Sequence, residues 1–590
     1  MRTVVSPRWP RPRTLATLSL DSPSFPALRT RRDAYVDKTS AIADLLASDE
    51  GMFRQSRAFF ARPRKFGKSL TLDVAAQMLA AGALPPGVAP WAGYAPVDVD
   101  AVFGGLDVHR RLRAGDPGLR GLLTRAHFVV KLGLGGAQTG VTLGGSIILQ
   151  AAIIAGAAFG SATEAKVLAA KEPGDAVGVL VSAVPRGVPV AVLVDEYDSA
   201  IIQDVTKKRW AAADAGIEAL RSLLMATKSP ETGPRIERCL VTGVARFART
   251  SLFSGANNFV DLTDDPLLAR VLGFSEAEIR KDFPAELKRL GDSLGTDIDG
   301  AVAELTRWYN GYSFDGVTTC FNPYPVLVSL RAGAITEREL DAASGTNWLS
   351  LTPGEVVDGL ATELQAGANS EPASVDIADL EARRVRAVPL LLQTGLLSLV
   401  AGDPRQCRPP NEYARRSLQR MVANALKVEP ATLAPFAAAL RSRDRAAFSA
   451  AVMRLFELIP RTLFKRDSGG DVGPREAVYH AALFAALKAA EFSDVSVQIQ
   501  WPSLQGVADL VVFFTGAPLK AAWVIEIGVG KNAAAKLPQA QRYAQALDAA
   551  DVFCCAIVVD KHAKSASVTA NNAALALAWS QRKDGAWVPA

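Results

Sequence analysis

The residues most able to carry chemistry form a short basic segment, Arg64 to Ser69 (RKFGKS). A phosphate loop needs backbone N–H groups that curl around oxygens, a lysine that reaches the β- and γ-phosphates, and a hydroxyl for magnesium. Gly67 permits the tight approach, Lys68 supplies the charge and Ser69 supplies the hydroxyl, so the segment predicts a nucleoside triphosphate site with Mg²⁺. The predicted nucleotide contacts are Arg64, Lys65, Phe66, Gly67, Lys68 and Ser69, and Ser69 is also a predicted metal ligand.

This loop departs from the general pattern at one position. The pattern has a glycine five residues before Gly67, and the chain has Arg62 there. On the motif alone, a basic turn before a helix explains the segment equally well. A strand-like run from Met52 to Ala61 precedes it, and apolar residues at helical spacing follow it from Leu70 to Met78. The loop therefore lies between a strand and a helix, whose positive N-terminus favours anions.

Two adjacent acids end a second informative segment. The run Val188–Val194 is continuously apolar, as in a strand buried on both faces of a parallel sheet, and Asp195 and Glu196 follow it directly. At the carboxyl edge of such a sheet, Asp195 could bind magnesium and Glu196 could orient or deprotonate an attacking water. Acids often mark a strand end without any function, but a phosphate loop followed by this pattern makes coincidence the minority explanation.

A third apolar run, Arg238 to Val244, contains Thr242 near its end, and Arg246 and Arg249 follow it. On a strand beside the acidic one, Thr242 could touch the γ-phosphate or the water, and the arginines could stabilise charge on the transferred phosphoryl group. A β-branched strand residue and solvated loop arginines explain these positions about as well. Thr242 and Arg246 are kept as predicted nucleotide contacts.

Strands separated by helical stretches predict a doubly wound parallel α/β domain of the phosphate-loop NTPase type. From about residue 275 to 470 the pattern is mostly helical. The last part predicts a compact α/β unit with one helix and four strands. The expected helix is Ala477–Ala490, and the expected strands are Val495–Gln500, Val507–Phe514, Ala522–Ile527 and Phe553–Val559.

Several blocks together resemble the AAA-ATPase-like family that carries a C-terminal PD-(D/E)XK nuclease-like domain. The resemblance implies an ATP-binding α/β domain with a helical lid, ATP and Mg²⁺ as cofactors, and a small restriction-endonuclease-like domain at the C-terminus. The predicted regions are a disordered basic tail (1–20), the ATPase domain (21–285), the helical lid and linker (286–470) and the nuclease-like domain (471–590). The matching blocks are 24–29 (SFPALR), 35–39 (YVDKT), 62–69 (RPRKFGKS), 195–198 (DEYD), 242–244 (TGV), 251–258 (SLFSGANN), 308–314 (WYNGYSF), 321–323 (FNP) and 392–395 (LQTG).

The nuclease-like part would carry its own acidic site. The resemblance implies that Asp509 and Glu526 are catalytic residues and metal ligands, and that Glu476 completes the metal site from a helix. Two acids buried on adjacent apolar strands are costly unless they are paired or bind a metal. The position of the usual lysine is Gly528. Either Lys531 or Lys536 could substitute for it, or the site is degenerate and serves structure or binding.

The composition of the chain bears on three further classes: disulfide-stabilised, zinc-binding and membrane proteins. The chain has 590 residues, a net charge of +6 and five scattered cysteines without a CxxC pair, so neither a disulfide framework nor a zinc site is indicated. The apolar run Ser146–Ala158 is too short to span a bilayer, so we expect a buried helix and no membrane partner. An intracellular, cytoplasmic setting is expected, and the arginine-rich start leaves organellar targeting open.

Two functions stay open on the sequence alone. The first is an Mg²⁺-dependent ATPase whose cycle works an intact or degenerate nuclease-like module on DNA or RNA. The second is a nucleotide-switched binding or scaffold protein without nuclease activity. A homo-oligomer is compatible with both.

Overall fold

The computed structural model describes most of the chain from the first predicted block onward. The described residues are 18, 24–46, 57–135, 141–207, 209–246, 258–336, 387–426, 430–458, 476–490, 495–503, 506–514, 521–529, 533–545, 547, 549, 551–559, 565–570, 577–581 and 587–589. The predicted basic tail at 1–20 therefore lies outside this part, except for Leu18.

A five-stranded sheet forms the centre of the N-terminal domain, and every strand pair in it is parallel. Its order is β2-β3-β4-β1-β5, so the strand before the phosphate loop lies beside β4, and β4 lies beside the acidic strand. This arrangement confirms the predicted parallel α/β fold. The strands are β1 (Arg57–Ala61), β2 (Phe128–Gly133), β3 (Val190–Asp195), β4 (Ile236–Gly243) and β5 (Val260–Asp261).

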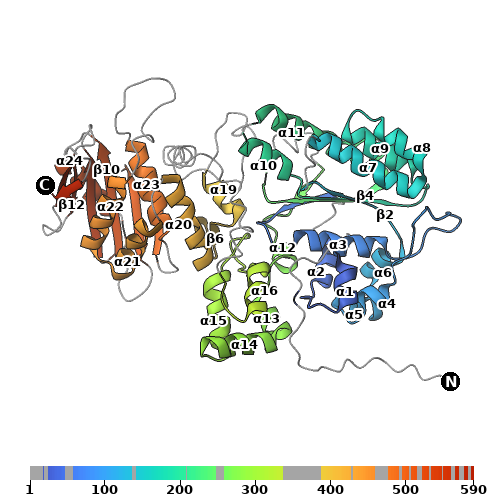
Figure 1. The fold of residues 1–590 in the computed structure, drawn as a ribbon, viewed down its shortest axis with the longest axis horizontal. Coiled ribbons are helices and arrows are strands. Elements are labelled where there is room, and N and C mark those ends of the chain that lie inside the picture. Colours follow the sequence, from blue (N-terminus) through green and yellow to red (C-terminus); the bar gives the residue numbers. More distant parts are fainter. Residues whose placement is uncertain are drawn as a thin grey trace.

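Helices cover both faces of this sheet (Figure 1). Successive residues of β3 enter opposite cores: Val192 packs on one side and Leu193 on the other, which explains the continuous apolar run. The first face carries α7 (Leu143–Phe159), α8 (Ser161–Leu168), α9 (Pro173–Ala183), α10 (Ser199–Thr206) and α11 (Trp210–Met225). The second carries α1 (Phe25–Arg31), α2 (Thr39–Leu46), α3 (Lys68–Ala80), α4 (Val99–Phe103), α5 (Asp107–Arg113), α6 (Pro117–Thr124) and α12 (Pro266–Val271).

The helix predicted at Ser146–Ala158 is α7, and it is apolar along almost its whole length but only partly buried. Small residues such as Ala151 and Ala155 pack on the sheet side, whereas Ile153 is 57 % exposed. No helix within the described ranges is both long enough and apolar enough to cross a bilayer.

A small helical unit follows the sheet domain. Its core is built from residues such as Phe283, Leu287 and Leu305, and a capping box joins Ser275 and Glu278 at its first helix. The predicted boundary at 285/286 falls inside α14. The helices of this unit are α13 (Glu276–Asp282), α14 (Pro284–Leu294), α15 (Ile298–Tyr309) and α16 (Pro323–Ala332). The short helix η1 (Gly233–Arg235) belongs to the sheet domain, where it precedes β4.

A seven-stranded sheet forms the C-terminal unit, in the order β14-β13-β12-β11-β10-β9-β8, and only its β10–β11 pair is parallel. The strands are β8 (Val495–Ser503), β9 (Gly506–Phe514), β10 (Ala521–Val529), β11 (Asp551–Val559), β12 (Ser565–Ala570), β13 (Leu577–Gln581) and β14 (Trp587–Pro589). The four predicted strands correspond to β8–β11, and the sequence reasoning missed β12–β14.

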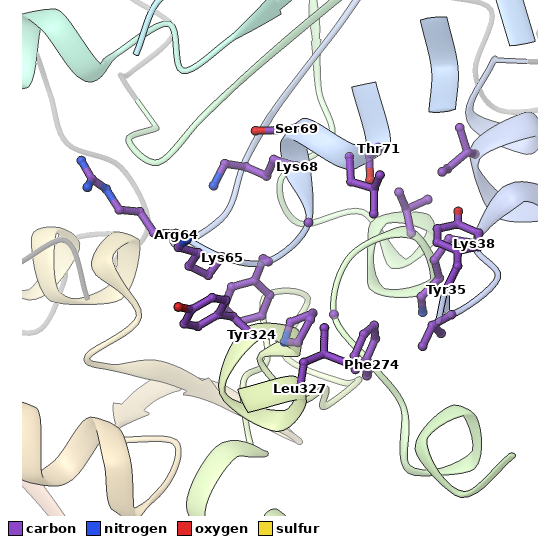
Figure 2. A pocket seen from close by; sticks show the side chains of 18 of the residues that line it. Tyr35, Lys38, Arg64, Lys65, Lys68, Ser69, Thr71, Phe274, Tyr324 and Leu327 are labelled. Atoms are coloured by element: carbon purple, nitrogen blue, oxygen red, sulfur yellow. The ribbon is translucent and has the colours of Figure 1, made fainter. Parts of the chain in front are cut away.

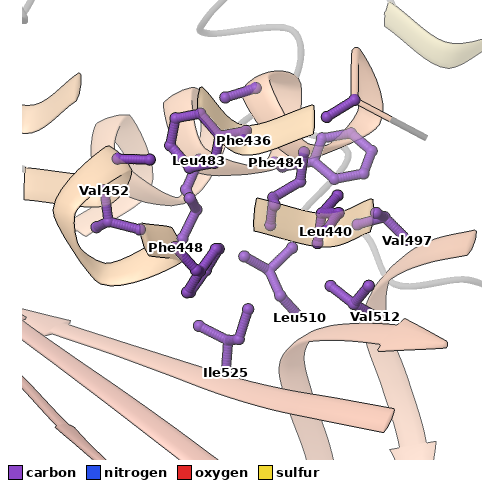
Figure 3. Packing of buried hydrophobic residues seen from close by; sticks show 14 of the residues in the cluster. Phe436, Leu440, Phe448, Val452, Leu483, Phe484, Val497, Leu510, Val512 and Ile525 are labelled. Carbon is purple, nitrogen blue, oxygen red and sulfur yellow. The ribbon is translucent and has the colours of Figure 1, made fainter. Parts of the chain in front are cut away.

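Helices pack on both faces of this second sheet. Phe436, Phe448 and Leu483 reach from α21, α22 and α23 onto the strands (Figure 3). The opposite face is covered by α24 through Ala540 and Tyr543. The helices are α21 (Ala434–Ser442), α22 (Arg445–Leu458), α23 (Glu476–Lys488) and α24 (Ala533–Ala544).

Short elements connect the helical unit to the C-terminal sheet. They are α19 (Ala387–Thr394), β6 (Ser398–Val400), β7 (Asp403–Arg408), α20 (Glu412–Leu426) and η4 (Pro430–Thr432). The predicted boundary at 470/471 lies outside the described residues. The domain limits and the restriction-endonuclease-like fold both stay predictions.

Candidate functional site

The loop between β1 and α3 has a backbone suited to an anion. Gly67 adopts φ 91°, a left-handed conformation that glycine reaches without a Cβ clash, and Lys65 adopts φ 67°. Gly67 is also the N-cap of α3, and no side chain caps the helix there. The positive end of the helix is therefore available to a bound phosphate.

Lys68 lies curled inside this loop. It is buried, and its Nζ donates hydrogen bonds of 2.9 Å each to the carbonyl oxygens of Arg62 and Pro63. Burial lowers the pKa of Lys68 to about 8, and the charge of Asp195 opposes that change. The ammonium is thus still charged at neutral pH, and phosphate oxygens could replace the two carbonyl acceptors.

Arg62 fills the place of the missing glycine without obstructing the loop. Its guanidinium donates to the carbonyl oxygens of Ala61 and Thr263 and lies 4.0 Å from the centre of the Phe314 ring. Burial lowers the pKa of Arg62 to about 10. The side chain therefore anchors the loop to neighbouring elements.

Asp195 and Glu196 end β3 at the same sheet edge. The Oδ1 atom of Asp195 is buried and has no hydrogen-bond partner, a costly state for a carboxylate oxygen unless a cation completes it. Ser69 is exposed at the first turn of α3, on the rim of the cavity described below. Asp195 and Ser69 provide oxygen atoms of the kind that magnesium prefers, and the charge of Asp195 acts on Lys68, the residue next to Ser69.

Glu196 is held in an unusual conformation against a glycine. Its φ is 53°, in the left-handed region that non-glycine residues seldom adopt. A Cβ added to Gly135, just beyond β2, would lie 1.5 Å from the Oε2 atom of Glu196. Gly135 thus provides the room that the Glu196 carboxylate occupies at the cavity wall.

Asp198 is a candidate that the sequence reasoning did not select as a site residue. Its buried Oδ2 accepts hydrogen bonds from the backbone N–H groups of Val244 and Ala245, the former at 2.9 Å. Gly243 makes this contact possible, because a Cβ there would lie 2.4 Å from Asp198 Oδ1. Burial raises the pKa of Asp198 to about 6. The only sequence signal was its place in the block DEYD.

A cavity of about 620 Å³ opens next to the phosphate loop, within the size range of small-ligand sites. Lys68, Ser69 and Thr71 lie on one side of it, and Phe274, Tyr324 and Leu327 face them (Figure 2). The Nζ of Lys65 lies 4.4 Å from the centre of the Tyr324 ring. The cavity thus has a cationic end beside α3 and a more apolar wall. The further apolar lining residues include Leu28, Val36, Ile42, Val271 and Phe283.

The remaining loop and strand residues divide into two groups. Arg64, Lys65, Phe66 and Gly67 line the cavity together with Lys68 and Ser69. Thr242 instead donates to the carbonyl oxygen of Phe60 at 3.0 Å, and Arg246 forms ion pairs with Asp261 and Asp264 at 2.6 Å each. Neither residue is part of the cavity lining, and Arg249 lies outside the described residues. Their roles toward a phosphoryl group stay predictions.

The C-terminal unit brings Asp509 and Glu526 together with Lys536 from α24. Lys536 Nζ lies 3.5 Å from Asp509 Oδ2 and 3.3 Å from Glu526 Oε2. Burial and then the charge of Asp509 raise the pKa of Glu526 to about 8. His480 Nε2 lies 3.7 Å from Asp509 Oδ2.

The predicted metal site at this acidic pair is described only in part. Among the described residues, no group of three or more His, Cys, Asp or Glu side chains is arranged to hold a metal ion. The side chain of Glu476, at the start of α23, and all of Lys531 lie outside the described part. The predicted metal role of Glu476 is therefore untested.

Comparison with known proteins supports the assignment of the N-terminal domain. A family model described as a predicted AAA-ATPase matches residues 21–81 and 158–253, which include the phosphate loop and the acidic end of β3. A protein of Azotobacter chroococcum mcd 1, described as an uncharacterized protein in the vnfD 5′ region, is 25 % identical over 491 residues. That similarity covers 82 % of this chain and 84 % of the relative. The family match supports an ATPase-like N-terminal domain.

The loop geometry predicts that Lys68→Ala weakens ATP binding about a hundredfold or more, because two charge-assisted hydrogen bonds to phosphate are lost. Isothermal titration with ATP, together with circular dichroism to check folding, measures this. The matched control is Lys288→Ala, since the Lys288 side chain is 68 % exposed on α14. A folded Lys68→Ala protein with wild-type ATP affinity would remove the loop from the nucleotide site.

Proposed function

We propose that this protein binds ATP between the phosphate loop and the helical unit and hydrolyses it with the help of Mg²⁺. The observation that carries the proposal is the meeting of Lys68 with the end of β3, where Asp195 Oδ1 is buried without a partner. A buried lysine and an unsatisfied carboxylate at one sheet edge provide the two charges that a nucleotide–magnesium complex requires.

The phosphate end of the site has a defined division of roles. Lys68 and the N-terminus of α3 would hold the phosphate oxygens. Ser69 and Asp195 would hold Mg²⁺, which neutralises phosphate charge when bound. Glu196 lines the cavity and would orient or deprotonate the attacking water. Asp198 holds the backbone after β4 in place beside them.

The nucleoside of ATP would bind against the cavity wall that lies opposite the phosphate loop. Tyr35, Phe274 and Tyr324 provide aromatic surface there, and α16 contributes Leu327. A purine base is flat and aromatic, so stacking on such side chains stabilises its binding more than scattered charges would. Because this wall belongs partly to the helical unit, bound ATP would bridge that unit and the sheet domain.

The alternative, a nucleotide-operated switch, is favoured by the packing behind the phosphate loop. The ring of Phe66 lies 5.0 Å from Tyr312 and 5.5 Å from Phe314, centre to centre. Between these two residues, the backbone N–H of Ser313 donates a hydrogen bond of 2.6 Å to the hydroxyl oxygen of Ser398, in β6. A nucleotide that shifts the loop would press on these contacts, whether or not hydrolysis follows.

For the C-terminal unit, we propose binding to DNA or RNA. The nuclease-like resemblance and the convergence of Asp509 with Glu526 support this proposal. The net charge of +6 is compatible with a nucleic-acid partner. Cleavage would require a cation to reach carboxylates that Lys536 already contacts. A homo-oligomer likewise stays a proposal.

Glu196→Gln should retain ATP binding and lose turnover by about a hundredfold or more, since an amide cannot accept the proton of the attacking water. Phosphate release and ATP titration on the same preparation measure both properties. Glu304→Gln, an exposed change on α15, is the matched control. Wild-type turnover in Glu196→Gln would exclude Glu196 from the mechanism and leave the switch as the better account.

Gly135→Ala tests the placement of Glu196 without changing its chemistry. The added Cβ would overlap the carboxylate, and a displacement of about 1 Å commonly costs on the order of a hundredfold in rate. We expect turnover to fall while ATP affinity changes little. Gly133→Ala is the control, because a Cβ there meets nothing within 4 Å. Equal turnover in the two variants would contradict the assigned position of Glu196.

A further inference from the structure

The hydrogen bonds around Asp509 and Glu526 leave little room for a cation. Glu526 Oε1 accepts from the Asp509 backbone N–H at 3.0 Å, and Asp509 Oδ2 accepts from the Ile527 N–H at 2.9 Å. Lys536 Nζ donates to Glu526 Oε2 and also to Asp509 Oδ2, which thus has two donors. Of the four carboxylate oxygens, only Asp509 Oδ1 lacks a donor within the described part of the chain.

The packing of α24 holds the Lys536 side chain beside the two acids. Lys536 belongs to the first turn of α24, and that helix packs through Ala540 and Tyr543 onto the sheet that carries both acids. The Lys536 side chain is only 7 % exposed, and Glu526 is fully buried. Gly528, two residues after Glu526, has no side chain with which to compete for this space.

We propose that Lys536 is the built-in counter-ion of this acidic pair and competes with divalent cations for the same oxygens. Its ammonium contacts both carboxylates at once, which is the position a bridging cation would take. A lysine that assists a bound metal must lie beside the ion and leave the carboxylate oxygens to it. The acidic pair, as folded, is therefore closed to a bridging cation, and any partner that the C-terminal unit binds, as proposed above, would be bound without metal-dependent cleavage at this pair.

Simple electrostatics gives the direction of the effect. When both acids are ionised, as they must be to bind a cation, two carboxylates and one ammonium carry a net charge of −1, whereas the carboxylate pair alone carries −2. A divalent ion entering beside Lys536 would also be repelled by the ammonium at short range. Removing the lysine charge should therefore increase affinity for a divalent cation by about tenfold or more.

The test uses Mn²⁺ and the full chain without nucleotide, with free Mn²⁺ measured by electron paramagnetic resonance. Lys536→Met should show a Mn²⁺ site at least about tenfold tighter than any in wild type. The double variant Asp509→Asn/Lys536→Met should lose that gain. Arg542→Met removes an equal charge from an exposed position on α24 and should behave as wild type.

Two results would contradict the role proposed for Lys536. Equal or weaker Mn²⁺ binding in folded Lys536→Met would show that the lysine does not exclude the cation. A second arm does not depend on that variant's folding: wild type and Asp509→Asn should bind the same number of Mn²⁺ ions at sub-millimolar concentration. One additional ion in wild type would show that the acidic pair already accepts metal beside Lys536, and the counter-ion role would be wrong.

Discussion

The parallel register of β1, β4 and β3 is the constraint on which the nucleotide site depends. Ala61 lies opposite Gly243, and Val194 lies opposite Val241, so all three strands reach the same sheet edge together. The phosphate loop, the acids after β3 and the backbone after β4 then meet there, although they are far apart in sequence. Asp198 reinforces the alignment through its bond to Val244, and Gly243 leaves the space for it.

The sequence predicted those parts of the fold whose burial leaves a simple pattern. The strand β3 is buried at every position, so its apolar run and its end at Asp195 could be identified directly. Glycine, lysine and a hydroxyl before apolar residues at helical spacing likewise indicated the loop at Gly67 and α3. By contrast, β2 lies at the sheet edge, and its outward residues, such as Lys131, are exposed. It therefore shows no continuous apolar run, and the sequence predicted no strand there.

Other features depend on contacts between distant segments and could not be read from spacing. Arg62 stands where the pattern has a glycine, and its side chain is held by Phe314 and by the carbonyl oxygen of Thr263. Gly135 matters only because Glu196 adopts a left-handed backbone conformation beside it. The choice between Lys531 and Lys536 stayed open in the sequence. The packing of α24 on the second sheet brings Lys536 to both carboxylates.

We propose that the loop from Arg62 to Lys68 recognises the β- and γ-phosphates of ATP, and every other role in the site depends on this recognition. Isothermal titration of wild-type protein with ATP and with AMP, both in Mg²⁺, tests this most directly. AMP lacks both phosphates that Lys68 and the N-terminus of α3 would hold, so we predict that it binds more weakly than ATP by at least about tenfold. Equal affinity for the two nucleotides, or no ATP binding by folded protein, would contradict the account.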